Sequence, residues 1–340
     1  MSDNALVSRE FRLASRPVGE PGPDNFELAT TEVPRQPGEG QVLVRNTWMS
    51  VDPYMRGRMN DAESYIPPFQ LGAALEGSAL GEVVASGTAD IPVGATVTHF
   101  LGWRDHALLD ASRATVVDTA IARPQDYLGA LGSTGLTAYL AVTETAPVSP
   151  GDVVFVSGAA GAVGSVAGQL ARLRGASRVI GSAGGPEKAR KLVEVFGFDA
   201  AIDYRAGSVA EQLADLAPEG IDVYVDNVGG DHLEAAIESL KVHGKAALVG
   251  MISGYNATGP VPGPSNIYRA VTRRLTLRGV LVSDHLDRFP EYIGKAAGWL
   301  ADGSLRTEET VVKGLEQAPA AFLGVLSGAN TGKMLVQLGD

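Results

Sequence analysis

The sequence predicts an α/β protein in which a doubly wound parallel sheet of the Rossmann type is joined to a second, β-rich part. Three observations lead to this fold class. A glycine-rich turn at 158–164 joins a predicted strand to a predicted helix. Strands and helices then alternate to about residue 300. Before residue 125 the chain has short β-rich segments that Pro and Gly interrupt.

The first part of the chain, residues 1–125, has the pattern of an irregular barrel or sandwich, because its apolar segments are short and evenly spaced. We expect strands at Ala5–Leu13, Phe26–Val33, Gln41–Val51, Leu75–Ser86, Ala95–Phe100 and Arg104–Leu109. The turn Asp52–Met59 and an irregular segment up to Pro68 separate the third strand from the fourth. A helical pattern with small residues follows at 127–143.

The alternating part predicts six strands and six helices. We expect the strands to begin near residues 152, 178, 199, 221, 244 and 275, and the helices near 163, 187, 208, 231, 267 and 286. Right-handed crossovers between parallel strands place such helices on both faces of one sheet.

The end of the chain predicts a strand at Glu309–Val312, a helix at Ala318–Leu326 and a strand at Lys333–Leu338. This tail is too short for a third domain, so we expect it to return to the first. The predicted domains are therefore 1–125, completed by 305–340, and 126–304.

The turn after the predicted strand Val153–Val156 has the spacing of a dinucleotide site. Gly161 and Gly164 occupy the second and third glycine positions of the G-x-G-x-x-G fingerprint, and Ala159 replaces the first. Glycines let the backbone approach a pyrophosphate, and the N–H groups and dipole of a helix N-terminus favour the anion. On this motif alone, a small-residue turn before a buried helix is the alternative interpretation.

The end of the second predicted strand favours NADP(H) over NAD(H). An NAD site usually has an acidic residue about 20 residues beyond the glycines. Here the segment 181–185 has no carboxylate, and Lys188 follows it. Tyr204 and Arg205 follow the third strand. A 2′-phosphate is repelled by an acid and bound by a cation, although a solvated lysine on an amphipathic helix is the alternative for Lys188.

Ligands of an open parallel sheet bind beyond the carboxyl ends of its strands. The fourth predicted strand ends at Asn227, and the fifth is followed by 249–256. Both could contact ribose and carboxamide, with ordinary turn chemistry as the alternative. Tyr255 lies in a Pro-rich loop, 253–266, where a phenol has no core to fill. Such a phenol can donate a hydrogen bond to a substrate oxygen that gains negative charge.

The composition argues against several classes of protein. A net charge of −11 with no long basic run disfavours binding to nucleic acid or to anionic membranes. No apolar stretch is long enough to span a bilayer, and the N-terminus lacks signal-peptide features, so we expect a cytoplasmic protein. The absence of cysteine excludes disulfides, thiol nucleophiles and cysteine-containing zinc sites.

The five histidines fit no metal-binding motif, so we expect no metal site. We interpret them as surface or hydrogen-bonded structural residues: His99, His106, His232, His243 and His285. Asp231 is expected to be the N-cap of the helix that contains His232.

Six motifs in order resemble the zinc-free alkenal and enone reductases of the medium-chain dehydrogenase/reductase superfamily, among them the prostaglandin and curcumin reductases. They are Met49–Met59, Gly135–Tyr139, Ala159–Gly164, Asp226–Gly230, Ile252–Asn256 and Gly328–Lys333. The resemblance covers nearly the whole chain and implies a GroES-like catalytic domain, a Rossmann domain and NADPH as cofactor. Zinc-dependent relatives carry Gly-His-Glu where this chain has Ala74-Leu75-Glu76, and leucine cannot ligate a metal.

The same resemblance implies cofactor contacts. Lys188 and Tyr204 resemble the residues at the 2′-phosphate. The pyrophosphate turn corresponds to Gly161, Ala162, Val163 and Gly164, and the remaining contacts to Asn227, Met251, Ser253, Tyr255, Val280 and Asn330. A homodimer through the edge strand near 275–282 is implied as well.

We expect hydride transfer from NADPH to the β-carbon of a small α,β-unsaturated ketone or aldehyde. Tyr255 and a ribose hydroxyl would then stabilise the enolate oxygen, and the α-carbon would take a proton from solvent or from a tyrosine. Tyr54 and Tyr65, which flank the other candidate active-site loop, are further catalytic candidates. A quinone reductase and a non-catalytic NADPH-binding sensor or structural protein are the alternatives.

Overall fold

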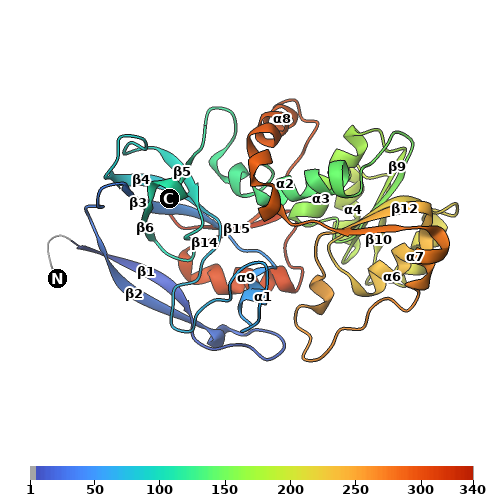
Figure 1. Cartoon of the computed structure of the whole chain (residues 1–340), viewed down its shortest axis with the longest axis horizontal. Coiled ribbons are helices and arrows are strands. Elements are labelled where there is room, and N and C mark those ends of the chain that lie inside the picture. The colour runs from blue at the N-terminus through green and yellow to red at the C-terminus, as the bar shows by residue number, and fades with distance from the viewer. Residues whose placement is uncertain (1–4, 340) are drawn as a thin grey trace. The chain divides into compact units, whose positions relative to one another are not determined.

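The computed structural model describes residues 5–339, which form two compact units (Figure 1). The first unit holds the chain up to Leu128, together with Glu309–Asn330 and the last segment from Met334. The second unit holds Gly129–Glu308 and Thr331–Lys333. No helix within the described residues is long and apolar enough to cross a membrane.

The first unit is built on a mainly antiparallel sheet and a separate hairpin. The sheet has the order β14-β15-β3-β4-β5-β7, and β6 pairs with β3. Its strands are β3 (Gln41–Ser50), β4 (Ala79–Ser86), β5 (Thr96–His99), β6 (His106–Asp110), β7 (Thr115–Val116), β14 (Glu309–Lys313) and β15 (Lys333–Gln337). The hairpin is formed by β1 (Ala5–Leu13) and β2 (Phe26–Pro34), which pair in antiparallel register.

An aromatic cluster fixes the irregular part of the first unit. The Trp103 ring lies 5.9–6.2 Å, centroid to centroid, from Phe11, Phe26 and Phe322. Phe322 belongs to α9 (Ala318–Leu326), so the C-terminal helix contributes to this core. The same core buries the short helix α1 (Met55–Arg58) through Met55 and Phe69 through its ring. The candidate active-site loop between Met59 and Phe69 therefore begins and ends on buried residues.

The second unit contains a parallel sheet with the order β10-β9-β8-β11-β12-β13. This is the Rossmann strand order. The strands are β8 (Val153–Val156), β9 (Arg178–Ala183), β10 (Ala200–Asp203), β11 (Ile221–Asp226), β12 (Leu240–Leu248) and β13 (Thr276–Gly279). Their runs of Val, Ile and Ala suit strands that are covered on both faces.

Helices cover both faces of this sheet, α3 and α4 on one and α6 and α7 on the other (Figure 1). The helices are α2 (Ser133–Leu140), α3 (Ala162–Leu173), α4 (Pro186–Glu194), α5 (Val209–Leu216), α6 (Gly230–Ser239), α7 (Tyr268–Arg273) and α8 (Phe289–Ala301). A Cβ on Gly168 would come within 2.0 Å of the Phe198 ring, so glycine allows α3 to pack closely there.

Some predicted elements differ from the observed ones. The predicted helix at 127–143 is divided into the 3₁₀ helix η3 (Pro124–Leu128), α2 and a π-helical turn at Ala141–Thr145. The first of these breaks follows from the glycines at 129 and 132, which weaken a helix. The fourth strand begins at Ala79 rather than Leu75, and β12 begins at Leu240, directly after α6, rather than near 244.

The prediction that Asp231 caps α6 is wrong. The N-cap is Gly229, which has a φ of 73°, and Asp231 lies in the first helical turn. The carboxylate of Asp226 provides the polar partner instead, since its Oδ1 accepts hydrogen bonds from the backbone N–H groups of Val228 and Gly229. The short β7 was not predicted, because a two-residue strand leaves no periodic pattern.

Candidate cofactor and active site

The glycine turn between β8 and α3 has the geometry of an anion site. Gly161 is the N-cap of α3, with an extended backbone, and the first N–H groups of the helix point out of its end. A Cβ on Gly164 would lie 2.4 Å from the carbonyl oxygen of Gly158, so only glycine fits this position. Ala162 and Val163 complete the turn. The donors and the helix dipole suit a pyrophosphate.

Two cationic side chains, Lys188 and Arg205, lie near the carboxyl end of β9. A Cβ on Gly184 would lie 2.5 Å from the Tyr204 hydroxyl and 3.0 Å from Arg205 Nε, so both side chains converge on this glycine. Burial, and then the charge of Arg205, lower the pKa of Lys188. A bound phosphate dianion would relieve this repulsion. The Ser182 hydroxyl beside this glycine is buried and has no hydrogen-bond partner among the described residues. The residues present therefore fit a 2′-phosphate.

A buried polar network holds the ends of β8 and β11. Asp226 is fully buried, and its Oδ1 accepts hydrogen bonds from Ser157 Oγ at 3.0 Å and from the Tyr224 hydroxyl at 2.7 Å. Asn227 donates from Nδ2 to the Ser157 carbonyl at 2.7 Å. The side-chain nitrogen of Asn227 is thus committed to the fold. No role is predicted from the sequence for the side chains of Ser157, Tyr224 and Asp226, although polar residues in or next to a buried strand are a signal for such a network.

Three predicted residues lie together where the chain leaves β12. The Tyr255 hydroxyl accepts a hydrogen bond from the Met251 backbone N–H at 3.3 Å. The Ser253 hydroxyl donates to the Val228 carbonyl at 2.6 Å. Burial raises the pKa of Tyr255. The phenol is half-buried rather than fully exposed, and its own proton has no acceptor in the described chain. Val280 lies beyond β13, and its N–H donates to the Leu248 carbonyl at 3.1 Å.

The other predicted site residues belong to the first unit. Tyr54 is the N-cap of α1, and its hydroxyl is buried without a hydrogen-bond partner among residues 5–339. Burial, followed by the charge of Asp52, raises its pKa well above the usual value. Tyr65 is 57% exposed. Asn330 also belongs to this unit. The structure therefore groups Tyr54 and Tyr65 on one unit and Tyr255 on the other.

Comparisons with known proteins agree with this architecture. A family model described as the N-terminal domain of oxidoreductase matches residues 9–117, and one described as zinc-binding dehydrogenase matches residues 162–298. The NADPH-dependent curcumin reductase of Escherichia coli is 38% identical over 343 residues, which cover 99% of each chain. The NADP⁺-dependent 2-alkenal reductase of Nicotiana tabacum is 34% identical over 339 residues, 98% of each chain.

A solved structure shows the same fold. The structure of CurA in complex with NADPH from Vibrio vulnificus superposes with a TM-score of 0.93 and 39% identity, and the match covers 98% of this chain and 99% of that one. The predicted Rossmann sheet and the β-rich second part are confirmed.

Proposed function

We propose that this chain, which belongs to the medium-chain dehydrogenase/reductase family of NADP-dependent oxidoreductases, reduces the C=C bond of α,β-unsaturated ketones and aldehydes. Its cofactor is NADPH. The names of the curcumin and 2-alkenal reductases support this substrate class. The observation that carries the proposal is the phenolic proton of Tyr255, which has no acceptor within the described protein and is available to a substrate oxygen.

The proposed reaction steps follow from the negative charge that develops on the carbonyl oxygen of the substrate. When bound, NADPH supplies a hydride and leaves as NADP⁺. On a bound enone the hydride would go to the β-carbon, the π electrons would move to the carbonyl oxygen, and the α-carbon would take a proton from solvent. Tyr255 donates a hydrogen bond to that oxygen as its negative charge develops. Because burial raises the pKa of Tyr255, the phenol stays protonated near neutral pH and acts as a donor.

The proposed cofactor contacts are the residues that the sequence analysis expects. Lys188 and Tyr204, with Arg205 beside them, would hold the 2′-phosphate. The turn Gly161–Gly164 would hold the pyrophosphate. Asn227, Met251, Ser253, Val280 and Asn330 are proposed as the remaining contacts. Tyr54 and Tyr65 remain candidates to contact the substrate.

We further propose that turnover needs no metal ion. The chain has no cysteine, and Leu75 stands where zinc-dependent relatives carry a histidine. Leucine has no donor atom for a metal. Dialysis against a strong chelator should therefore leave kcat unchanged.

The enone reaction is tested by following NADPH oxidation with 4-phenylbut-3-en-2-one and, separately, with 1,4-benzoquinone. We expect kcat/KM for the enone to exceed that for the quinone at least tenfold, with the saturated ketone as product. A preference for the quinone would replace the proposal by quinone reduction. Repeating both assays with NADH tests the cofactor preference.

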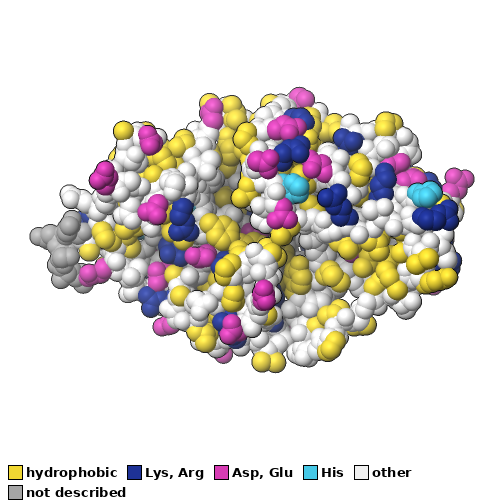
Figure 2. All heavy atoms as spheres, in the orientation of Figure 1, with side chains coloured by type: hydrophobic (Ala, Val, Ile, Leu, Met, Phe, Trp, Pro, Cys, Tyr) yellow, Lys and Arg dark blue, Asp and Glu magenta, His cyan; other side chains and the backbone are white. Residues whose placement is uncertain are grey.

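The edge of the parallel sheet in the second unit suggests how two copies of the chain assemble. β13 is an edge strand, and an exposed edge is a template for pairing with another strand. Tyr268 and Val271 of the adjacent α7 are 70% and 68% exposed. Figure 2 shows hydrophobic side chains gathered on the surface over α6 and α7. We propose that two copies of the chain pair at this edge to form a homodimer.

A further inference from the structure

Near the carboxyl end of the parallel sheet, three buried polar atoms have no hydrogen-bond partner among residues 5–339. They are Ser182 Oγ, Asp226 Oδ2 and His232 Nε2. The three residues are 0%, 0% and 7% exposed, respectively. A buried polar atom without a partner destabilises the folded protein, so such atoms are rare in native structures. Three of them in one region indicate a site for a further polar group.

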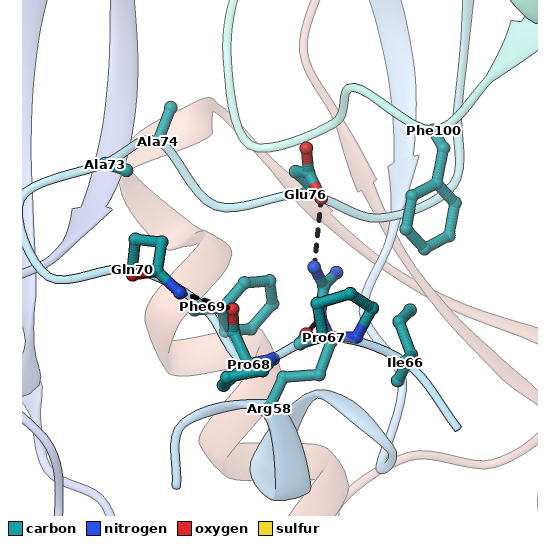
Figure 3. Close-up of a pocket in the computed structure, with 10 residues that line it drawn as sticks. All are labelled: Arg58, Ile66, Pro67, Pro68, Phe69, Gln70, Ala73, Ala74, Glu76 and Phe100. Carbon is teal, nitrogen blue, oxygen red and sulfur yellow. Dashed lines mark hydrogen bonds and ion pairs between the residues drawn. The ribbon is translucent and has the colours of Figure 1, made fainter. Parts of the chain in front are cut away.

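This region differs from the place in the first unit where a guanidinium nitrogen is unpartnered. There, Arg58 lines a cavity of about 490 Å³ and pairs with Glu76, and its Nη1 is the atom without a partner (Figure 3). That volume suits a small organic molecule. Ser182, Asp226 and His232 do not line that cavity. Because they are almost inaccessible to solvent, a partner that fits among them has the size of a water molecule.

Strand alternation places Ser182 and Asp226 on the same face of the sheet. Ile180 and Tyr224 belong to one buried cluster together with residues of α6. Ser182 follows the first of them by two residues and Asp226 follows the second by two, and side chains two apart on a strand share a face. Ser157, at the end of β8 between their strands, donates from Oγ to Asp226 Oδ1 at 3.0 Å. Ser182 and Asp226 therefore face α6.

His232 lies over this end of the sheet. It belongs to the first turn of α6, whose N-cap, Gly229, donates its N–H to Asp226 Oδ1 at 2.8 Å. Burial lowers the pKa of His232, and the charge of Asp226 is the largest opposing effect, so the two side chains interact. The imidazole centroid lies 5.4 Å from that of the Tyr204 ring. Since Tyr204 follows β10, the imidazole reaches across the end of β9, the strand that carries Ser182.

The donors and acceptors of the three groups are complementary to one water molecule. Because the pKa of His232 is lowered, its imidazole is neutral near pH 7 and can donate a proton from Nε2. The Ser182 hydroxyl can donate as well, whereas a carboxylate oxygen of Asp226 only accepts. A water molecule that accepts from the first two and donates to the third gives each of them a partner. Buried waters typically make about three such hydrogen bonds.

We propose that one buried water molecule joins Ser182, Asp226 and His232. This bridge holds the imidazole edge-on against the Tyr204 ring, so that the Tyr204 hydroxyl stays beside Gly184. His232 is then a positioning residue that acts through Tyr204 and determines the preference for NADPH over NADH. The inference rests on the proposed function for one point, the contact of Tyr204 with the 2′-phosphate.

The positioning role is tested by fluorescence titration of the full chain with NADPH and with NADH. Tyr204→Phe should raise the Kd of NADPH about tenfold, because it removes one hydrogen bond to a charged group. His232→Leu keeps that hydroxyl but releases its orientation, so it should raise the Kd of NADPH by a similar factor. The Kd of NADH should stay the same in both variants. An equal loss for the two nucleotides in His232→Leu would overturn the role.

A double-variant cycle separates positioning from an independent effect of the histidine. If His232 acts through the Tyr204 hydroxyl, His232→Leu should not weaken NADPH further in the Tyr204→Phe background. A double variant whose loss is the product of the two single losses would overturn the positioning. Ile237→Val is the control, because it changes a buried residue of the same helix and lowers stability without reaching Tyr204. Both of its Kd values should equal those of the unaltered protein.

The water molecule is tested on the unaltered protein, so this result does not depend on how a variant folds. A crystal structure that resolves ordered water should place one molecule about 2.7–3.2 Å from each of the three unpartnered atoms. They are Ser182 Oγ, Asp226 Oδ2 and His232 Nε2. A direct hydrogen bond between His232 and Asp226, or no water between them, would overturn the bridge.

The outcomes separate this inference from the proposed function. Nucleotide binding needs no turnover, so the titrations do not depend on which substrate the protein reduces. An unchanged Kd of NADPH in Tyr204→Phe would overturn the proposed phosphate contact and the positioning role with it. A loss in Tyr204→Phe without a loss in His232→Leu would overturn the positioning role alone.

Discussion

Tyr255 and Tyr54 are phenols whose pKa burial raises, but their hydroxyl groups have different partners. The Tyr255 oxygen accepts a hydrogen bond from Met251, which orients the phenol and directs its proton away from that contact. The Tyr54 hydroxyl has no hydrogen-bond partner in the described chain. An oriented donor stabilises developing charge with little reorganisation. This difference is why we assign the enolate oxygen to Tyr255.

Replacement of that donor gives the first prediction. Tyr255→Phe should lower kcat on an enone by about 10²–10³-fold, because one oxyanion donor typically contributes that much. The Kd of NADPH, measured by fluorescence titration, should change less than threefold. Tyr127→Phe removes a hydroxyl that donates to the Asp118 carbonyl, away from every proposed site, and serves as the control. An unchanged kcat would remove Tyr255 from the mechanism.

Lys188 gives the second prediction. Lys188→Ala should raise the Kd of NADPH roughly 10–100-fold, since a charge-assisted contact to phosphate contributes about 1.5–3 kcal/mol. The Kd of NADH, which lacks the 2′-phosphate, should stay the same. Lys313→Ala, an exposed lysine of the first unit, is the control. A similar loss for both nucleotides would contradict the phosphate role.

At the scale of elements, His99 links β5 to β3. Its Nε2 lies 2.9 Å from Asn46 Oδ1, and its Nδ1 accepts a hydrogen bond from the Leu101 N–H at 3.0 Å. This arrangement requires the neutral imidazole. Burial, with a smaller contribution from Arg104, lowers the pKa of His99 to about 3. His99 therefore has the structural role expected from the sequence. Protonation of its imidazole at low pH should destabilise the fold.

The third prediction follows from the direction of that shift. The pKa of His99 is lower in the folded protein than its unfolded value of about 6.5. The contribution of its neutral imidazole to the free energy of unfolding is therefore complete above about pH 6.5 and is lost as the pH falls toward 3. At pH 5 this residue alone should lower the free energy of unfolding by about 2 kcal/mol. Urea denaturation at pH 7 and pH 5 measures the difference. His99→Gln should shrink it, and His243→Asn, at an exposed site with φ of 66°, should not.

Most strands of the second unit could be predicted to within one residue of their start, because apolar runs between glycines define buried parallel strands. β11 and α4 begin at or within one residue of the expected positions. The start of β12 could not be predicted, because no turn residue separates it from α6. The network around Asp226 is formed by side chains of two strands, so its hydrogen bonds appear only in the fold.

At the scale of the whole molecule, the order of the motifs indicates the family. The sequence does not predict which distant segments are in contact. Lys188 and Tyr204 could be paired by their positions at neighbouring strand ends. The guanidinium carbon of Arg58 lies 5.8 Å from the centroid of the Phe100 ring, and no periodic pattern relates these two residues. His232 packs edge-on against Tyr204, at 5.4 Å between ring centroids, which its place in α6 does not indicate. Contacts between irregular segments are therefore the feature that the sequence predicts least well.

The fourth prediction concerns assembly. Light scattering should give twice the chain mass of 35.3 kDa. Because the Val280 N–H donates to β12, strand alternation turns the Gly279 N–H toward the open edge. Gly279→Pro removes that donor and should yield monomers. Gly263→Pro, in an exposed loop, should remain dimeric. Monomeric wild-type protein would contradict pairing at this edge.

The central claim is that this protein delivers hydride from NADPH to the β-carbon of an enone. The most direct measurement uses NADPH carrying deuterium at both C4 positions, with 4-phenylbut-3-en-2-one as substrate and NMR of the product. We predict 4-phenylbutan-2-one with a single deuterium on the β-carbon and an intact carbonyl. Deuterium on the carbonyl carbon of an allylic alcohol, or no transfer of label at all, would contradict it.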